Sequence, residues 1–371
     1  MRTQRGFSII ELTVAMALGL VVTGAVLATF VSMHSASGVT SGESVVADNG
    51  RIALDVIQQA LRAGGYMACN STQRQAVSMG GVAPTPMTYD FTEAISAYEA
   101  VGTSPGSTFA LSATPAADLN GNDWTSIAAL GDALDSSVTT VGQAAGYPPI
   151  KGSDVIAVHT TYSQVQPVYT NGNGGGNTVP VQVTTGLQAN QIAIVSNCAW
   201  SEVDEIQTVG ANAVTFKYPL LGTYAPGAQV AVADTIVFYI GKGADGDGAL
   251  FMYELAPNPT FQTPAVEIVP DVENMQILYG VDTTGQWLSA TEYVTADQVA
   301  TAAAGNTSGC LAFNCVISVK VAVLAASPLG TVPKPPQSQK FSLLGTTITA
   351  PQDTRARQSF DMTISLRDNT N

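Results

Sequence analysis

Charged residues are scarce in this sequence. Asp, Glu, Lys and Arg make up only 11% of its 371 residues, against roughly 25% in ordinary soluble domains. Basic residues are the rarer kind, at 14 against 28 acidic ones. Such a surface would repel a phosphate backbone, which excludes nucleic acid as the main partner. The 46% apolar content still allows a substantial core, so we expect an exported, folded protein.

Histidine and the common catalytic motifs are also lacking. The histidines are His34 and His159 alone, and there is no GxSxG turn, Walker A loop or HExxH helix. A serine or cysteine nucleophile needs a base beside it, most often histidine. His34 follows the apolar N-terminal stretch, and His159 lies in an expected strand, where a packed or surface imidazole is the ordinary explanation. We therefore expect no enzyme and no cofactor.

Cysteine is rare but even in number, at four residues. An even count in an exported chain of low charge indicates two disulfides, although four cysteines permit three pairings. We favour Cys310 with Cys315, which closes a short loop, and Cys69 with Cys198. The alternative is a zinc site, which would need CxxC-like spacing with further Cys or His nearby. The two histidines do not supply this, and we expect no metal.

The N-terminus holds the longest apolar run. Residues 12–33 contain no Asp, Glu, Lys or Arg, and a helix of that length reaches about 33 Å, close to the bilayer's hydrocarbon thickness. Arg2 and Arg5 precede it, so the positive-inside rule places the N-terminus in the cytoplasm and everything after Met33 outside. An ordinary secretory signal has a shorter apolar core. We expect one membrane-spanning helix.

Glu11 is the unusual residue of this stretch. A carboxylate at the edge of an apolar helix costs several kcal/mol unless something pairs with it. One interpretation is that Glu11 reaches the membrane interface or supports the positive N-terminal end of the helix dipole. The other is that a partner outside this helix neutralises it.

The residues around Glu11 favour the second interpretation. Arg5-Gly6-Phe7-Ser8-Ile9-Ile10-Glu11 resembles the class III signal of type IV pilins and type II secretion pseudopilins. The resemblance implies that a prepilin peptidase cleaves after Gly6, that the new amino group of Phe7 is methylated, and that the apolar helix is retained. It also implies that Glu11 meets the amino group of a neighbouring subunit in the filament core.

The pattern after the membrane span predicts a continuing helix. Leu54, Ile57 and Leu61 recur at i, i+3 and i+7 and share one face. Polar and charged residues fall largely on other faces, namely Arg51, Asp55, Gln58 and Arg62. Gly64 and Gly65 are expected to end the helix, and the apolar face to pack on the rest of the chain.

The resemblance continues after the span, at Glu43, Asp48-Asn49-Gly50-Arg51, Leu61 to Tyr66, and Cys69. These residues resemble the segment that follows the membrane anchor in PilW-like minor pilins, and Cys69 falls at the position of that segment's cysteine. Later and looser similarities cover residues 240–253, 272–282 and 355–367. The resemblance reaches most of the chain except roughly residues 70–150 and several loops.

In the remaining chain the sequence pattern has a period of two, which is typical of strands. Eight segments rich in Val, Ile, Thr and aromatic residues predict an antiparallel β-rich domain: 155–161, 191–195, 213–218, 235–240, 250–254, 275–281, 316–324 and 360–366. Residues 68–149 show no convincing strand pattern, and we interpret the region near 70–150 as a variable insertion.

Two acidic segments have an alternative as calcium sites. Asp245-Gly246-Asp247-Gly248 would offer calcium its preferred oxygen ligands, but Asp-Gly between two apolar runs is first a hairpin turn. The segment from Asp118 to Asp123 begins like an EF-hand loop but lacks its Gly and its final Glu. We expect turns or loops in both places.

Together these features predict an α+β fold with a long N-terminal helix packed on a large antiparallel β-rich domain. The expected parts are a leader (1–6), a transmembrane and assembly helix (7–33), its amphipathic continuation (34–65) and a periplasmic or extracellular globular domain (66–371).

The resemblance implies a minor pilin that helps to prime a type IV pilus and sits at its tip. It starts in the inner membrane and reaches the cell surface. Its partners would be other minor pilins, the major pilin, the prepilin peptidase and a tip adhesin. The alternatives are a J-like pseudopilin of type II secretion and a membrane-anchored extracellular binding protein.

Overall fold

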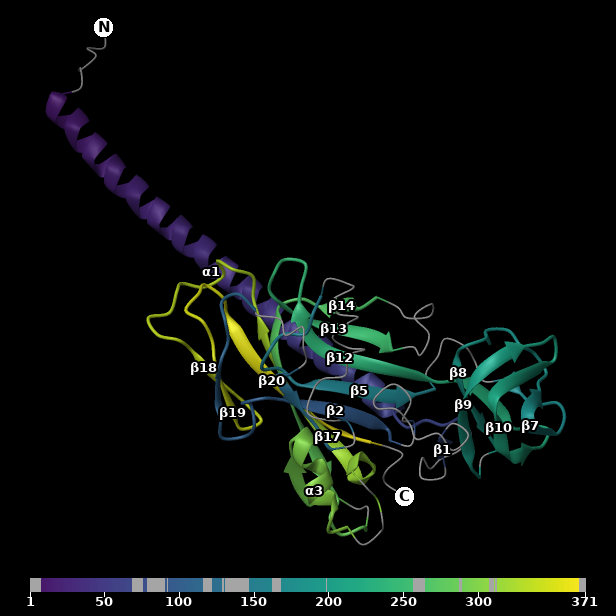
Figure 1. Ribbon diagram of the computed structural model, residues 1–371. Helices are drawn as coiled ribbons and strands as arrows, with labels where there is room; N and C mark the ends of the chain where they lie inside the picture. Colours follow the sequence, from purple (N-terminus) through teal and green to yellow (C-terminus); the bar gives the residue numbers. More distant parts are fainter. Residues whose placement is uncertain are drawn as a thin grey trace.

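The computed structural model describes the chain in ranges separated by gaps. These ranges are 8–68, 76–78, 91, 93–115, 122–128, 130, 147–161, 168–197, 199–255, 264–286, 289–306, 310 and 312–366. One long helix, α1 (Ile9–Ala63), precedes a large head made mostly of antiparallel strands. The head also contains the short helices η3 (Ala296–Gln298), α3 (Val299–Ala303) and η4 (Ala312–Cys315). The predicted fold class is confirmed (Figure 1).

Helix α1 is continuous and is capped at both ends. The Ser8 side chain accepts a hydrogen bond from the Ile10 N–H at 3.4 Å, which satisfies one of the free donors of the first turn. At the other end, Gly64 is the C-cap and Gly65 takes a φ of 79°. The Gly65 N–H donates to the His159 carbonyl at 2.8 Å. The glycines therefore end the helix as predicted and attach it to a strand of the head.

The second half of α1 buries the predicted apolar face. Leu54, Ile57 and Leu61 are at most 4% exposed, and Val46 and Ala53 extend the face. Arg51, Asp55 and Arg62 are exposed on the other side. The buried face belongs to the main hydrophobic core of the head.

Two sheets share this core with α1. The four-stranded sheet has the order β16 (Glu292–Val294), β15 (Val272–Val281), β17 (Val316–Ala326), β20 (Arg357–Ser365). The six-stranded sheet has the order β14 (Val266–Val269), β13 (Gly248–Leu255), β12 (Asp234–Lys242), β5 (Val155–Thr160), β2 (Ile95–Ala100), β4 (Trp124–Thr125). A small sheet of β18 (Lys340–Leu343), β19 (Thr346–Thr349) and β3 (Thr108–Ala110) lies beside the four-stranded one (Figure 1).

A seven-stranded sheet forms a separate lobe, which we call the distal lobe (residues 168–232 with β1). Its strands are β6 (Val168–Tyr169), β11 (Gln229–Val232), β8 (Ile192–Ser196), β9 (Ser201–Val209), β10 (Ala213–Tyr224) and β7 (Gly174–Pro180), with β1 (Ala76–Ser78) paired to β9. It has its own core around Phe216 and Ile206. The lobe lies at the end of the molecule opposite the N-terminal half of α1 (Figure 1).

All eight predicted strands are present, with ends shifted by a few residues, as β5, β8, β10, β12, β13, β15, β17 and β20. The expectation of no strand in residues 68–149 is wrong, because β1 to β4 lie there, whereas the variable insertion near 70–150 stays a prediction. Strand β2 lies between β5 and β4, and all six of its residues are buried. Asp154 fixes its end, accepting hydrogen bonds from the Ala100 N–H at 2.9 Å and the Ile277 N–H at 2.7 Å.

One predicted disulfide is present. Cys310 and Cys315 are bonded, with their Cα atoms 5.4 Å apart, a separation typical of disulfides. The bond closes the turn at η4, directly before β17. Cys69 and Cys198 lie outside the described residues, so their pairing stays a prediction.

Gly50 sets how closely α1 approaches β20. A Cβ atom built on Gly50 would lie 2.1 Å from Cδ2 of Phe360, far inside van der Waals contact. The Phe360 ring of β20 therefore occupies the space that any other residue at position 50 would need. Next to it, the Asn49 side-chain amide donates to the Pro270 carbonyl at 3.0 Å.

His159 fastens three strands of the six-stranded sheet together. Its Nε2 lies 3.0 Å from Ser96 Oγ of β2, and its Nδ1 lies 2.9 Å from Thr235 Oγ1 of β12. The side chain is buried, and burial lowers the pKa of His159 to about 3. It is therefore a neutral, hydrogen-bonded core residue at neutral pH, which agrees with the packed imidazole that the sequence analysis considered.

Replacing Gly50 by alanine should destabilise the protein by about 1–3 kcal/mol, the usual cost of overpacking. Thermal or denaturant unfolding of the detergent-solubilised chain measures it. Gly38→Ala is the control, because nothing lies within 4 Å of a Cβ there, and it should be neutral or slightly stabilising. In a Phe360→Ala background the cost of Gly50→Ala should largely disappear. Equal effects at positions 50 and 38 would contradict the packing role.

The low pKa of His159 predicts a pH dependence of stability. Below about pH 6.5 the unfolded chain binds a proton at this residue that the folded chain does not, so the free energy of unfolding falls as pH falls. Relative to His159→Gln, the wild type should lose roughly 1.4 kcal/mol per pH unit between pH 6 and 4 and nothing between pH 7 and 9.

The comparison with His159→Gln isolates this residue. Burial raises the pKa of Glu99 and of Asp154, with Asp154 adding to the effect on Glu99. These carboxyls contribute with the opposite sign but equally in both proteins. Parallel stability curves for the two proteins over the whole range would show that His159 is not a buried neutral imidazole.

Candidate assembly site on the N-terminal helix

The first half of α1 stands free of the head. Its large apolar side chains from Ile9 to Met33 are 51–81% exposed, and none of its most apolar 18-residue window is buried. By length and composition this helix is able to cross a membrane. Figure 1 shows it projecting from the head as a single rod. An apolar surface of this size requires lipid or other helices around it.

Hydroxyl groups within this half bond to their own helix. Thr13 Oγ1 donates to the Ile10 carbonyl at 2.9 Å, and Thr23 Oγ1 donates to the Gly19 carbonyl at 2.8 Å. Thr29 Oγ1 donates to the Val26 carbonyl at 2.8 Å. These threonines therefore carry no unsatisfied donor into an apolar environment.

Glu11 is the exception on this surface. It lies in the first turn of α1, beside Ile10, Val14, Ala15 and Leu18, with which it lines a shallow groove. Within the described part of the chain no cation pairs with it. The N-terminal end of the helix dipole favours a carboxylate here, but an apolar environment would still leave the charge in need of a partner from another molecule.

The predicted processing site lies just outside the described residues. Gly6 and Phe7, expected to be the cleavage and methylation residues, precede Ser8, where the description begins. Their roles stay predictions.

The Asp245–Gly248 segment is a hairpin turn between β12 and β13. The Gly243 N–H donates to the Asp247 carbonyl at 2.7 Å, and Gly246 takes a φ of 93°. Carboxylate oxygens of Asp245, Asp247 and Asp271 lie within 4.8 Å of one another. The Arg355 guanidinium pairs with two of them, Asp247 and Asp271. The positive charge in this cluster is therefore an arginine, and the turn interpretation is confirmed.

Other candidate residues do not form a reactive site. His34 is exposed on α1, before the part of the helix that packs on the head. Ser96 and His159 are in contact but are 0% and 1% exposed, so substrate cannot reach them. In the second acidic segment, Asp123 pairs with Lys151, and Asp118 to Gly121 lie outside the described residues.

Two protein families match this chain. The prokaryotic N-terminal methylation motif matches residues 1–27, which include the predicted processing site, Glu11 and most of the free half of α1. The family described as Type IV Pilus-assembly protein W matches residues 237–368, from β12 to just beyond β20. No curated protein matches the chain.

The two matches fall on the two parts of the structure that the sequence singled out. One covers most of the apolar rod, and the other covers β15, β17 and β20, which pack on α1. The methylation motif at the N-terminus and the PilW region in the head are together consistent with a PilW-like type IV pilin.

Proposed function

We propose that this minor pilin helps to prime a type IV pilus and sits at the pilus tip. The observation that carries the proposal is the free apolar half of α1 with Glu11 on its first turn. Such a rod is suited to two environments, a bilayer before assembly and a bundle of like helices afterwards. The PilW match favours a pilus over the J-like pseudopilin of type II secretion.

Before assembly the subunit is anchored in the inner membrane. Arg2 and Arg5 hold the N-terminus in the cytoplasm, and the head is periplasmic. Prepilin peptidase cleaves between Gly6 and Phe7 and leaves a methylated amino group on Phe7. These steps are inferred from the leader's resemblance and from the methylation motif over residues 1–27.

On assembly, Glu11 pairs with the Phe7 amino group of a neighbouring subunit. In lipid the carboxylate is costly, whereas in a helix bundle it gains a positive partner at one register only. The pairing thus favours both the departure of the subunit from the membrane and its correct axial register in the filament. The neighbours are other minor pilins and, below them, the major pilin.

The distal lobe supports a position at the tip. It extends the head at the end opposite the free half of α1 (Figure 1). Subunits of a helical filament join head to tail along the axis, so such a lobe would occupy space that the next subunit needs. At the tip that space is open, and it is also where an adhesin would bind.

Replacing Gly6 by a bulky residue should block processing, because the peptidase must fit closely around the backbone there. Membrane fractions should then contain a precursor six residues longer than the mature chain, as judged by mass spectrometry of the N-terminus. Gly19→Ala serves as a control outside the leader and should be processed normally. Mature wild-type protein with Phe7 still internal would refute the leader assignment.

Glu11→Val should be processed and inserted in the membrane but enter pili poorly, because it lacks the charge that pairs with a neighbour. Glu11→Asp should retain part of the function. Immunoblots of membrane and sheared-pilus fractions measure this in a strain without the wild-type copy, with surface pili counted in parallel.

Thr13→Val is the matched control for the Glu11 variants, since Thr13 lies in the same part of the rod and its hydroxyl bonds only to its own helix. It should enter pili normally. Normal incorporation and pilus number for Glu11→Val would remove the pairing role.

A further inference from the structure

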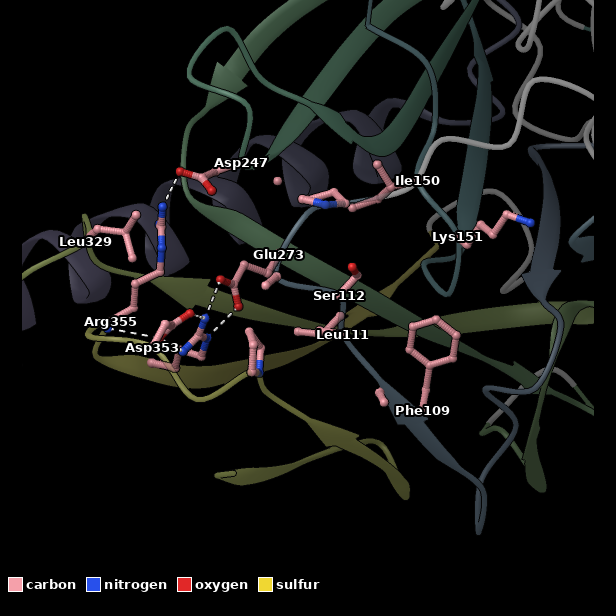
Figure 2. A pocket seen from close by; sticks show the side chains of 16 residues that line it. Phe109, Leu111, Ser112, Ile150, Lys151, Asp247, Glu273, Leu329, Asp353 and Arg355 are labelled. Carbon is pink, nitrogen blue, oxygen red and sulfur yellow. Dashed lines mark hydrogen bonds and ion pairs between the residues drawn. The ribbon is translucent and has the colours of Figure 1, made fainter. Parts of the chain in front are cut away.

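A cavity of about 400 Å³ opens in the head beside the β12–β13 hairpin. Its size falls within the range of about 300–1,000 Å³ found for ligand sites. It lies between that hairpin, the start of β15, the segment that follows β3 and the chain just before β20 (Figure 2). We call it the head cavity. It has two unlike walls.

One wall is apolar. Phe109 and Leu111 come from β3 and the residue after it, and Ile150 precedes β5, whereas Leu329, which follows β17, lies beside Arg355 at the other end of the cavity (Figure 2). The Phe109 ring packs directly over Gly152, because a Cβ atom at that position would lie 2.1 Å from the ring. Leu329 is 64% exposed at the rim. This wall can remove an aliphatic or aromatic group from water.

The other wall is ionic, and both of its arginines pair with carboxylates. Arg357 Nε and Nη2 donate to Glu273 at 2.6 and 2.9 Å, while Nη1 and Nη2 donate to Asp353 at 2.7 and 2.5 Å. Arg355 Nη1 donates to Asp271 and to the Ser327 carbonyl, and its Nη2 pairs with Asp247. An anionic ligand would have to compete with these carboxylates for either guanidinium.

The formal charge of this ionic cluster is negative. Of its groups, Arg355 and Arg357 line the cavity with three carboxylates, Asp247, Glu273 and Asp353, so their sum is 2 − 3 = −1. The carboxylates of Asp245 and Asp271 lie beside Asp247 and add to the negative charge. Burial alone would raise the pKa of Asp353, but the hydrogen bonds and charge of Arg357 outweigh it and hold that pKa below its usual range. The cluster therefore attracts a cation.

The neighbouring Lys151 does not reverse this preference. It lines the cavity at the far side and pairs with Asp123. A ligand that matches both walls carries an apolar group and a positive charge side by side.

We propose that the head cavity binds a peptide segment of a neighbouring pilus subunit in which an aromatic or aliphatic side chain adjoins a lysine or arginine. The apolar side chain contacts Phe109 and Leu111, and the cation lies against Asp247 and Glu273, beside Leu329. The identity of the partner rests on the proposed function, whereas the chemistry of the segment rests on the cavity alone.

The two walls come from different parts of the chain. All five carboxylates and both arginines lie within the region that matches the PilW family, whereas Phe109, Leu111 and Ile150 precede it. The apolar wall would thus select the apolar side chain of the bound peptide, and the ionic wall would require a basic residue next to it.

Capped peptide probes test the chemistry on the full mature chain in detergent. The probes are Gly-Ser-Phe-Lys-Ser-Gly and two variants, one with Glu for Lys and one with Ser for Phe, each with a fluorophore for polarisation. The Phe-Lys peptide should bind at least about tenfold more tightly than either variant, and high salt should weaken it. Binding of none of the three, or preference for the Phe-Glu peptide, would overturn the proposal.

Surface variants test the place of binding without disturbing the ion pairs. Ser112→Lys adds a cation at the exposed rim and should weaken the Phe-Lys peptide while favouring the Phe-Glu peptide. Leu329→Ser should weaken the Phe-Lys peptide several-fold. Leu221→Ser in the distal lobe is the matched control, because Leu221 is 65% exposed, and it should change nothing. Equal effects of the two leucine variants would refute the assignment to this cavity.

The partner is tested in assembled pili with a photocrosslinker in place of Ser112. The crosslinked peptide should belong to another pilus subunit and contain a basic residue beside an apolar one. A crosslink to lipid or to a protein outside the pilus would refute the partner. The peptide measurement contains no pili, so its failure and a failure of the Glu11 experiments are distinguishable.

Discussion

The free half of α1 exposes an apolar surface that the described head leaves uncovered. Water does not tolerate such a surface along a whole rod, so the subunit depends on an environment supplied by lipid or by other helices. Glu11 adds a second demand, because a carboxylate on that rod needs a positive partner. The two demands conflict in a bilayer and are both met in a bundle of helices that present amino groups. The same apolar surface would then serve first to anchor the subunit in the membrane and later to assemble it with other helices.

The head must be joined rigidly to this rod for the arrangement to work. Gly50 allows β20 to lie directly on the helix, with the Phe360 ring in the place of a side chain. At the far end, β5 caps the helix, since Thr160 Oγ1 donates to the Ala63 carbonyl at 2.9 Å and the His159 carbonyl accepts from Gly65. The position of the rod in a filament therefore fixes where the head cavity and the distal lobe point.

Most of the main core could be predicted from the sequence, because its strands are rich in β-branched residues and α1 has a regular apolar period. Strand β2 could not. Its polar residues Ser96 and Glu99 are buried, and burial raises the pKa of Glu99. Strands far along the chain bury them, and a local sequence pattern does not show this. Strand β9 was missed for a similar reason. Its Glu202 is buried and accepts from the Leu221 and Gly222 N–H groups at 2.6 and 2.8 Å.

Glu11, the proposed assembly residue, was easier to single out from the sequence than the head cavity. Glu11 stands out because it is an acid on an apolar run, and that contrast is local. The cavity brings together Phe109, Glu273 and Arg357 from three distant segments, and no spacing in the sequence links them. Likewise, Arg355 decides that the Asp245–Asp247 turn already holds a positive charge.

The position of the subunit in the pilus is tested most directly by labelling the distal lobe. The turn between β9 and β10 is exposed at Gly210 to Asn212, so an epitope inserted after Ala211 can be detected with gold in electron micrographs of intact pili. A tip subunit predicts gold at one end of each labelled pilus and none along the shaft. Gold spaced regularly along the shaft, or pili without label while the protein stays in the membrane, would contradict this account.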